Sequence, residues 1–167
     1  MKTYFYTTNI CFFLSCLLLV SLSGCGQPVD PEAAGKENVT GLVRLNGTPL
    51  AGAMISFIPV DSDSSAGSGG SGHTKADGKF SMLGRNGLRP GKYRVIIVCH
   101  TPYDRRTRAP ATPDTGEEHE YLVNVVPPEF GDNSTLEFEV VAGRRNVFDY
   151  NIETSFTPDT SPGAPPI

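Results

Sequence analysis

The chain has 167 residues, with 14 lysines and arginines against 18 aspartates and glutamates, so its formal net charge is −4 at pH 7. A chain of this length is expected to form one domain. Proteins that bind nucleic acid usually present a basic surface, and the acidic balance therefore argues against a nucleic-acid partner. The chain contains four cysteines and no tryptophan.

The first element along the chain is a short apolar segment. Residues 10–22 read ICFFLSCLLLVSL and are preceded by a single basic residue, Lys2. This run is shorter than the roughly 20 residues that a membrane-spanning helix needs. A short apolar run followed by small residues is typical of a secretory signal peptide, which we predict for residues 1–24.

The signal segment ends in LSGC at residues 22–25, which resembles the lipobox of bacterial lipoproteins at all four positions. The resemblance implies cleavage between Gly24 and Cys25, and attachment of lipid to the Cys25 thiol and of a fatty acid such as palmitate to the new amine. Such chains hold a protein firmly on a membrane. By resemblance to Gram-negative sorting rules, Gly26 in place of aspartate implies the outer membrane of the cell envelope. The alternative is a membrane span with an incidental cysteine, but no basic residue follows until Lys36.

Two further segments flank the predicted domain. Residues 25–38 are polar and rich in proline and glycine, and we interpret them as the lipidated cysteine and a flexible tether. Residues 153–167 contain four prolines and no apolar pattern, which predicts a disordered tail. Beyond Cys25 only Cys99 remains, so we expect the domain at 39–152 to depend on its hydrophobic core alone, without a disulfide.

Residues 39–152 predict an all-β sandwich, because apolar residues recur with period two and turn residues separate the runs. We predict about seven strands, at residues 39–45, 53–59, 79–83, 92–100, 121–126, 136–141 and 146–152. The run at 92–100 is apolar on both faces, which predicts a central strand. Flexible or charged loops are predicted at 61–72 and 101–121. The inward faces predict mutual packing of six side chains: Phe57, Tyr93, Val95, Ile97, Phe138 and Phe148.

Three stretches of this region resemble the carboxypeptidase regulatory-like domain. They are VTGLVRLNGTPLAGA at 39–53, TKADGKF at 74–80 and LRPGKYRV at 88–95. Residues 127–152 are similar to the end of small bacterial lipoproteins built on this domain. The resemblance implies a single transthyretin-like or immunoglobulin-like β-sandwich. Because such domains are mostly accessory or surface-attached modules, it also implies a structural or binding role and supplies no active-site residues.

The sequence predicts no catalytic, cofactor-binding or metal-binding residue. The three histidines, His73, His100 and His119, show no metal-ligand spacing, and no GxSxG nucleophile motif occurs. Residues 61–65, DSDSS, resemble part of a calcium loop, but no closing glutamate follows. Intradiol dioxygenases share the sandwich architecture and hold iron with two tyrosines and two histidines, yet this chain lacks their closely spaced pattern.

Arg105, Arg106 and Arg108 form a basic half of the loop at 101–121, and an acidic half follows at 114–120. Arginine suits carboxylate and phosphate groups of an envelope polymer or protein; the alternative is a solvated loop whose two halves neutralise each other. Taken together, we expect a monomeric, lipid-anchored envelope protein with a structural or binding role and no catalysis. The alternative function is a carbohydrate- or envelope-polymer-binding module, although the chain lacks the tryptophan that such modules often expose.

Overall fold

The computed structural model describes residues 30–60, 69–116, 119–158 and 160. These residues form an all-β fold, which confirms the predicted fold class. The strands are β1 (Val39–Leu45), β2 (Thr48–Pro49), β3 (Met54–Pro59), β4 (Gly70–His73), β5 (Lys79–Met82), β6 (Gly91–Val98), β7 (His100–Asp104), β8 (Glu120–Asn124), β9 (Glu137–Val140) and β10 (Asn146–Ile152). Short 3₁₀ turns lie at η2 (Pro31–Ala33), η3 (Gly84–Asn86) and η5 (Pro128–Phe130).

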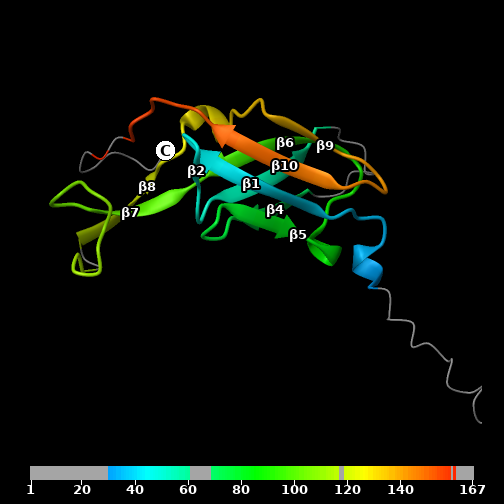
Figure 1. Cartoon of the computed structure of the whole chain (residues 1–167), viewed down its shortest axis with the longest axis horizontal. Coiled ribbons are helices and arrows are strands. Elements are labelled where there is room, and N and C mark those ends of the chain that lie inside the picture. The colour runs from blue at the N-terminus through cyan, green and yellow to red at the C-terminus, as the bar shows by residue number, and fades with distance from the viewer. Residues whose placement is uncertain (1–29, 61–68, 117–118, 159, 161–167) are drawn as a thin grey trace, which may run out of the picture.

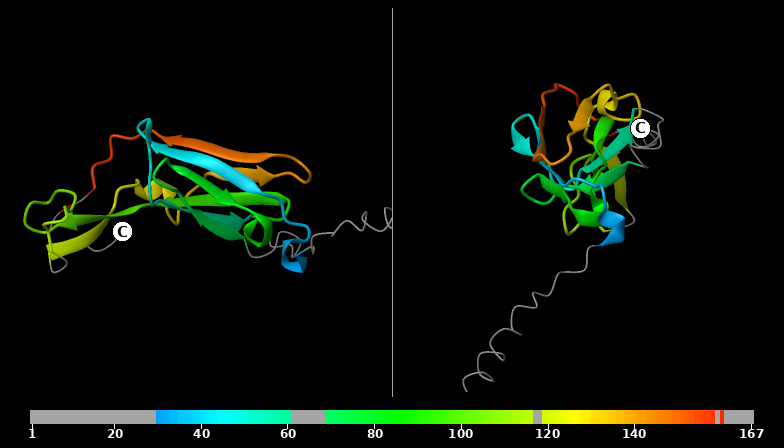
Figure 2. Two further views of the ribbon diagram at one scale, coloured as in Figure 1. Left: turned by 60° about the horizontal axis from the view of Figure 1, so that its bottom comes forward. Right: turned by 90° about the vertical axis from the view of Figure 1, so that its right-hand side faces the viewer.

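Two four-stranded sheets make up the sandwich. One has the order β10-β1-β2, with β5 also paired to β1, and the other has the order β4-β3-β6-β9. β1 and β10 run parallel from the pair Val39 and Asn146 to the pair Leu45 and Ile152. Figures 1 and 2 show the β1–β10 layer lying over the β3–β6 layer. β6 pairs with both β3 and β9, so the predicted central strand is confirmed.

An aromatic cluster joins the two layers. The ring centroid of Phe57 on β3 lies 6.1 Å from that of Phe80 and 5.8 Å from that of Phe148, both on the opposite sheet. Phe57 also meets Tyr93 at 6.4 Å and Phe138 at 5.8 Å within its own sheet. Offset and edge-on contacts of this kind add to the free energy gained by burying the rings. Five of the six side chains expected to pack together are buried in this core, and the sixth, the half-buried Phe138, packs against it. The predicted period-two register is confirmed.

Gly41 of β1 provides the space that the aromatic cluster occupies. A methyl group at this position would lie 1.9 Å from the carbonyl oxygen of Phe148 and 2.6 Å from the ring of Phe80. Only glycine therefore fits the middle of this strand. A tight hairpin follows β1, since Asn46 and Gly47 have φ of 49° and 82°, as a type I′ turn requires.

The predicted loop at 61–72 is wrong at its C-terminal end, where β4 begins at Gly70. Its inward positions are Gly70 and Gly72, where an added methyl group would lie 2.8 Å and 3.2 Å, respectively, from the Met82 side chain. The absence of side chains on this face lets β4 pack closely against Met82 of β5. The strand shows no period-two apolar pattern because its inward face is glycine, while residues 61–68 lie outside the described residues.

The predicted strand at 92–100 and the predicted loop at 101–121 also need correction. β6 ends at Val98, and after Cys99 the chain continues as β7, which pairs in antiparallel register with β8. The expected edge strand at 121–126 is present as β8, at Glu120–Asn124. These shifts and the added β2 and β4 give ten strands among the described residues instead of about seven.

Both flanking segments contact the sandwich where they are described. In the predicted tether, Glu37 forms a β-bridge with Leu88, and its carboxylate accepts a hydrogen bond from the Gly143 amide at 3.0 Å. In the predicted tail, Thr154 exchanges hydrogen bonds with the Asn46 side chain at 2.9 Å and 3.0 Å. The packed structure thus extends beyond 39–152 at both ends, because polar side chains rather than apolar patterns hold these segments.

Replacing Phe138 by alanine tests the core register. Phe138 is half-buried, with its ring centroid 5.5 Å from that of Phe148. We therefore expect Phe138→Ala to lower the free energy of unfolding by roughly 3 kcal/mol, the lower end of the range for this substitution. That loss should lower the thermal midpoint by about 10 °C. The control Glu139→Ala changes an exposed neighbour, and equal losses from the two variants would contradict the register. Calorimetry of both variants makes the comparison.

Candidate binding ribbon

The antiparallel pair of β7 and β8 forms a two-stranded ribbon, and Figure 2 shows it projecting from one end of the sandwich. The pairing runs from His100 with Asn124 to Asp104 with Glu120. At the base, the Asn124 side-chain oxygen accepts hydrogen bonds from the Cys99 and Val126 amides, both at 3.1 Å. These bonds hold the ribbon where it leaves the sandwich.

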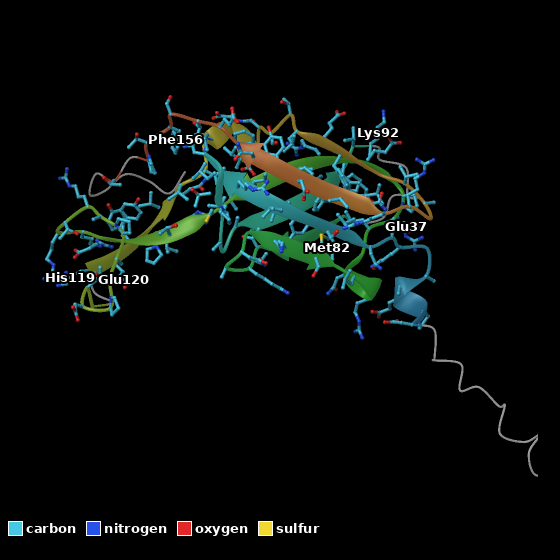
Figure 3. All side chains as sticks on the ribbon, in the orientation of Figure 1. Glu37, Met82, Lys92, His119, Glu120 and Phe156 are labelled. Atoms are coloured by element: carbon cyan, nitrogen blue, oxygen red, sulfur yellow. The ribbon has the colours of Figure 1, made fainter. Side chains whose placement is uncertain are left out.

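The ribbon and the N-terminal end of the described chain lie at opposite ends of the molecule. Figure 3 places His119 and Glu120 at the far end of the ribbon and Glu37 and Lys92 at the other end of the sandwich. The views in Figures 1 and 2 agree, since η2 lies away from β7 and β8 in both. The first described residues of the chain therefore lie on the side away from the ribbon.

Asp104 organises the turn that follows β7. Its buried carboxylate accepts a hydrogen bond from the Arg106 amide at 2.7 Å, and its oxygen lies 3.6 Å from the Arg106 Nε. The backbone hydrogen bond from Arg106 is the main cause that holds the pKa of Asp104 below its ordinary value, with the Arg106 charge acting in the same direction. The ionised carboxylate is thus the form that this turn favours.

The structure brings the three predicted arginines together in this exposed turn, but with different partners. The Arg105 guanidinium lies 6.0 Å from the centroid of the Tyr121 ring, and Arg106 donates to the Thr115 carbonyl at 3.4 Å. Arg108 is exposed and has φ of 56°, which is uncommon outside glycine. The predicted loop is therefore a structured turn with arginines on its surface.

One edge of the ribbon is covered by its own connection. The Asp104 amide donates to the Ala109 carbonyl, and the Ala111 amide donates to the Pro102 carbonyl, both at 2.9 Å. The tail reaches the ribbon as well, because the Tyr121 hydroxyl donates to the Thr160 carbonyl at 2.7 Å. The sequence pattern predicts β8 but not its partner β7, because Pro102 and the polar residues of β7 hide its alternation.

The histidines occupy three separate elements. His73 ends β4, His100 begins β7, and His119 lies before β8 at the far end of the ribbon. Among the residues that the structure describes, no group of three histidine, cysteine or acidic side chains is arranged to hold a metal ion. Cys99 is buried, and burial raises the pKa of its thiol, so the protonated form is favoured at neutral pH.

A shallow hollow lies on the outer face of β5, β1 and β10, with a volume of about 460 Å³. Strand pairing sets its floor in two rows, which are Ser81, Thr40 and Val147, and Lys79, Leu42 and Asp149. Lys75 and Arg145 line its rim, while Lys79 forms an ion pair of 3.4 Å with Asp77. The hollow thus combines hydroxyl groups with charges of both signs. The sequence does not indicate this hollow, because its floor residues are ordinary outward positions of three strands that are far apart in the chain.

The predicted lipidation and cleavage residues, Cys25 and Gly24, lie outside the described residues. Within the described ranges, no helix has the length and apolar character needed to cross a membrane. Comparison with protein-family models, curated proteins and solved structures found no match. Any function must therefore be inferred from the residues of this chain and their arrangement.

Replacing Asp104 by alanine tests its role in the turn at a pH where its carboxylate is ionised. Because the folded-state pKa of Asp104 lies below its ordinary value, its stabilising contribution is present above about pH 4 and is lost as the pH falls through the lowered pKa. We expect Asp104→Ala to speed hydrogen exchange of the Arg106 amide at neutral pH, measured by NMR. The variant Asp114→Ala, in the same connection, is the control. Unchanged exchange in Asp104→Ala would contradict this role.

Proposed function

We propose that this protein is a lipid-anchored component of a bacterial cell envelope that presents its ribbon for binding, with no catalytic step. The observation that carries the proposal is the placement of η2 and the ribbon at opposite ends of the molecule (Figure 1). An anchor at Cys25 would hold one end at the membrane, and the arginine-bearing turn would face away from it. The lipobox-like residues 22–25 support the anchor, and a carboxypeptidase regulatory-like module accords with an accessory role.

The position of the ribbon favours a binding role, because the ribbon projects from the sandwich instead of packing against it (Figure 2). A two-stranded ribbon is marginally stable by itself, and this one is held by specific contacts at Asn124, Asp104 and Tyr121. Those contacts keep an exposed element in one conformation, which reduces the conformational entropy lost when a partner binds. Arg108 and Arg105 supply positive charge on an otherwise acidic chain.

The anchor is tested by replacing Cys25 with serine. Lipid attachment requires the thiol, so Cys25→Ser should abolish incorporation of a labelled fatty acid in bacterial cells. It should also leave residues 1–24 uncleaved, which a higher molecular mass of the variant would show. Cys99→Ser is the matched control, because this buried thiol has no part in the proposed attachment. Continued labelling of Cys25→Ser would overturn the anchor.

The hollow on the β5–β1–β10 face favours envelope-polymer binding as a second candidate function. Its hydroxyl groups on Thr40 and Ser81 suit sugar hydroxyls, and the rim cations Lys75 and Arg145 suit the carboxylates or phosphates of an anionic polymer. Phe80 is the aromatic residue that lines the hollow, but it is buried and its ring packs against Phe57 and Phe148 in the core. The candidate is therefore an anionic polymer rather than a neutral glycan stacked on a ring.

The double variant Lys75→Glu/Arg145→Glu tests this second candidate. We expect it to lose sedimentation with isolated anionic envelope polysaccharide, whereas Arg105→Glu/Arg108→Glu on the ribbon should retain it. Sedimentation that is unchanged by the first variant would exclude the hollow as the binding site. Far-ultraviolet circular dichroism checks that both variants keep their strand content.

A further inference from the structure

The two edges of the ribbon differ in their main-chain hydrogen bonding. The Pro102 carbonyl and the Asp104 amide on β7 bond to the connection at Ala111 and Ala109, so the main-chain groups of residues 102 and 104 face away from β8. In an antiparallel ladder, successive residues face alternately toward and away from the partner strand. Since Pro102 pairs with Leu122 and Asp104 with Glu120, the main-chain groups of Leu122 and Glu120 face the outer edge of β8.

The outer edge of β8 is open within the described residues. No hydrogen bond from another described segment reaches the main-chain amide or carbonyl of Glu120 or Leu122. Natural proteins usually protect such an edge with lysine, proline, a bulge or a covering segment. β8 has neither lysine nor proline, whereas the opposite edge at β7 is covered by residues 109–111. This asymmetry marks β8 as an edge that accepts another strand.

Leu122 makes this edge apolar at its centre. Its side chain is 62 % exposed, the highest value among the exposed large hydrophobic side chains that the structure describes. Leu122 pairs across the ribbon with Pro102, which is also exposed. Burying an exposed leucine is worth roughly 1.5 to 3 kcal/mol, so a strand added at β8 gains apolar contact as well as main-chain hydrogen bonds.

We propose that a second copy of this chain pairs with β8, antiparallel and centred on Leu122. A two-fold axis at this residue places Leu122 opposite Leu122 of the second copy, and Glu120 opposite Asn124 of the second copy. The two apolar side chains then meet, and no like charges face each other, an arrangement that stabilises a cross-strand pair. The edge is thus complementary to itself, as a two-fold interface requires.

The paired ribbons form one continuous four-stranded sheet, in the order β7-β8-β8-β7, with a sandwich at each end. The two η2 ends then point in opposite directions, so the pairing joins copies on two facing surfaces rather than neighbours on one surface. The interface is small, so we expect a weak, concentration-dependent dimer. This proposal rests on the binding role given above to the ribbon, and it identifies the partner. It does not depend on the lipid anchor, so failure of the Cys25 test and failure of the pairing test are distinguishable.

Variants that place like or opposite charges at residue 122 of the two copies test the pairing directly. Two differently tagged copies of the full chain are expressed together and purified in detergent through one tag, and the other tag is then measured. We expect wild type to retain wild type, while Leu122→Lys paired with itself and Leu122→Glu paired with itself should lose retention, because like charges meet at the axis. The mixture of Leu122→Lys with Leu122→Glu should restore it.

Any other result of this co-purification experiment would overturn the proposal. Retention by the Lys–Lys and Glu–Glu pairs would exclude pairing at residue 122, and loss without rescue in the mixed pair would assign Leu122 to a different partner. Absence of retention between two wild-type copies would exclude the dimer. Since Leu122 is exposed, these substitutions should leave the fold intact, which circular dichroism checks.

A cysteine at the same position gives an independent measurement. Hydrogen-bonded antiparallel partners have Cα atoms about 5.5 Å apart, a separation that a disulfide spans. Leu122→Cys should therefore form a disulfide-linked dimer on mild oxidation of the full chain. Leu83→Cys is the matched control, because Leu83 is 53 % exposed but lies beside β5. Equal cross-linking of the two variants would overturn the proposal.

Discussion

The fold depends on the position of Phe57 between the two sheets. Its ring contacts aromatic rings from β5 and β10 in one layer and from β6 and β9 in the other. Sheets pack face to face about 10 Å apart, and large rings fill that distance where smaller side chains would leave voids. Since there is no disulfide among the described residues, the two layers are held by apolar contacts, and this aromatic cluster contributes many of them. Gly41 complements it by leaving β1 without a side chain where the rings need space.

Sequence patterns predict the core well because burial there imposes period two. Phe80 and Met82, Tyr93 and Val95, and Phe138 and Val140 each lie inward as the alternation requires. The pattern fails where another constraint sets the residues. β4 is built on glycines that make room for Met82, and after Cys99 the chain changes partner, because β6 pairs with β3 and β9 whereas β7 pairs with β8. Neither a glycine face nor a change of pairing partner leaves an apolar signal.

The candidate site is harder to predict than the core for a related reason. Composition indicates the three arginines of the turn, but their arrangement depends on the Asp104 carboxylate, which is distant from any recognisable motif. The open edge of β8 follows from the direction of main-chain groups, which requires the pairing register and not residue types. Likewise, the tail contact between Tyr121 and Thr160 joins residues far apart in sequence. Such features become visible only when the strands are placed in space.

The parallel pairing of β1 and β10 has a mechanical consequence. β1 follows directly from the N-terminal segment and runs along the length of the sandwich (Figure 1). Its ladder with β10 extends over the whole strand, and β5 and β2 pair along its other side. A force pulling on the N-terminal end along this strand would load these hydrogen bonds in shear, all at once, instead of opening them one at a time. The same strand that makes room for the aromatic core therefore makes this end of the protein resistant to tension.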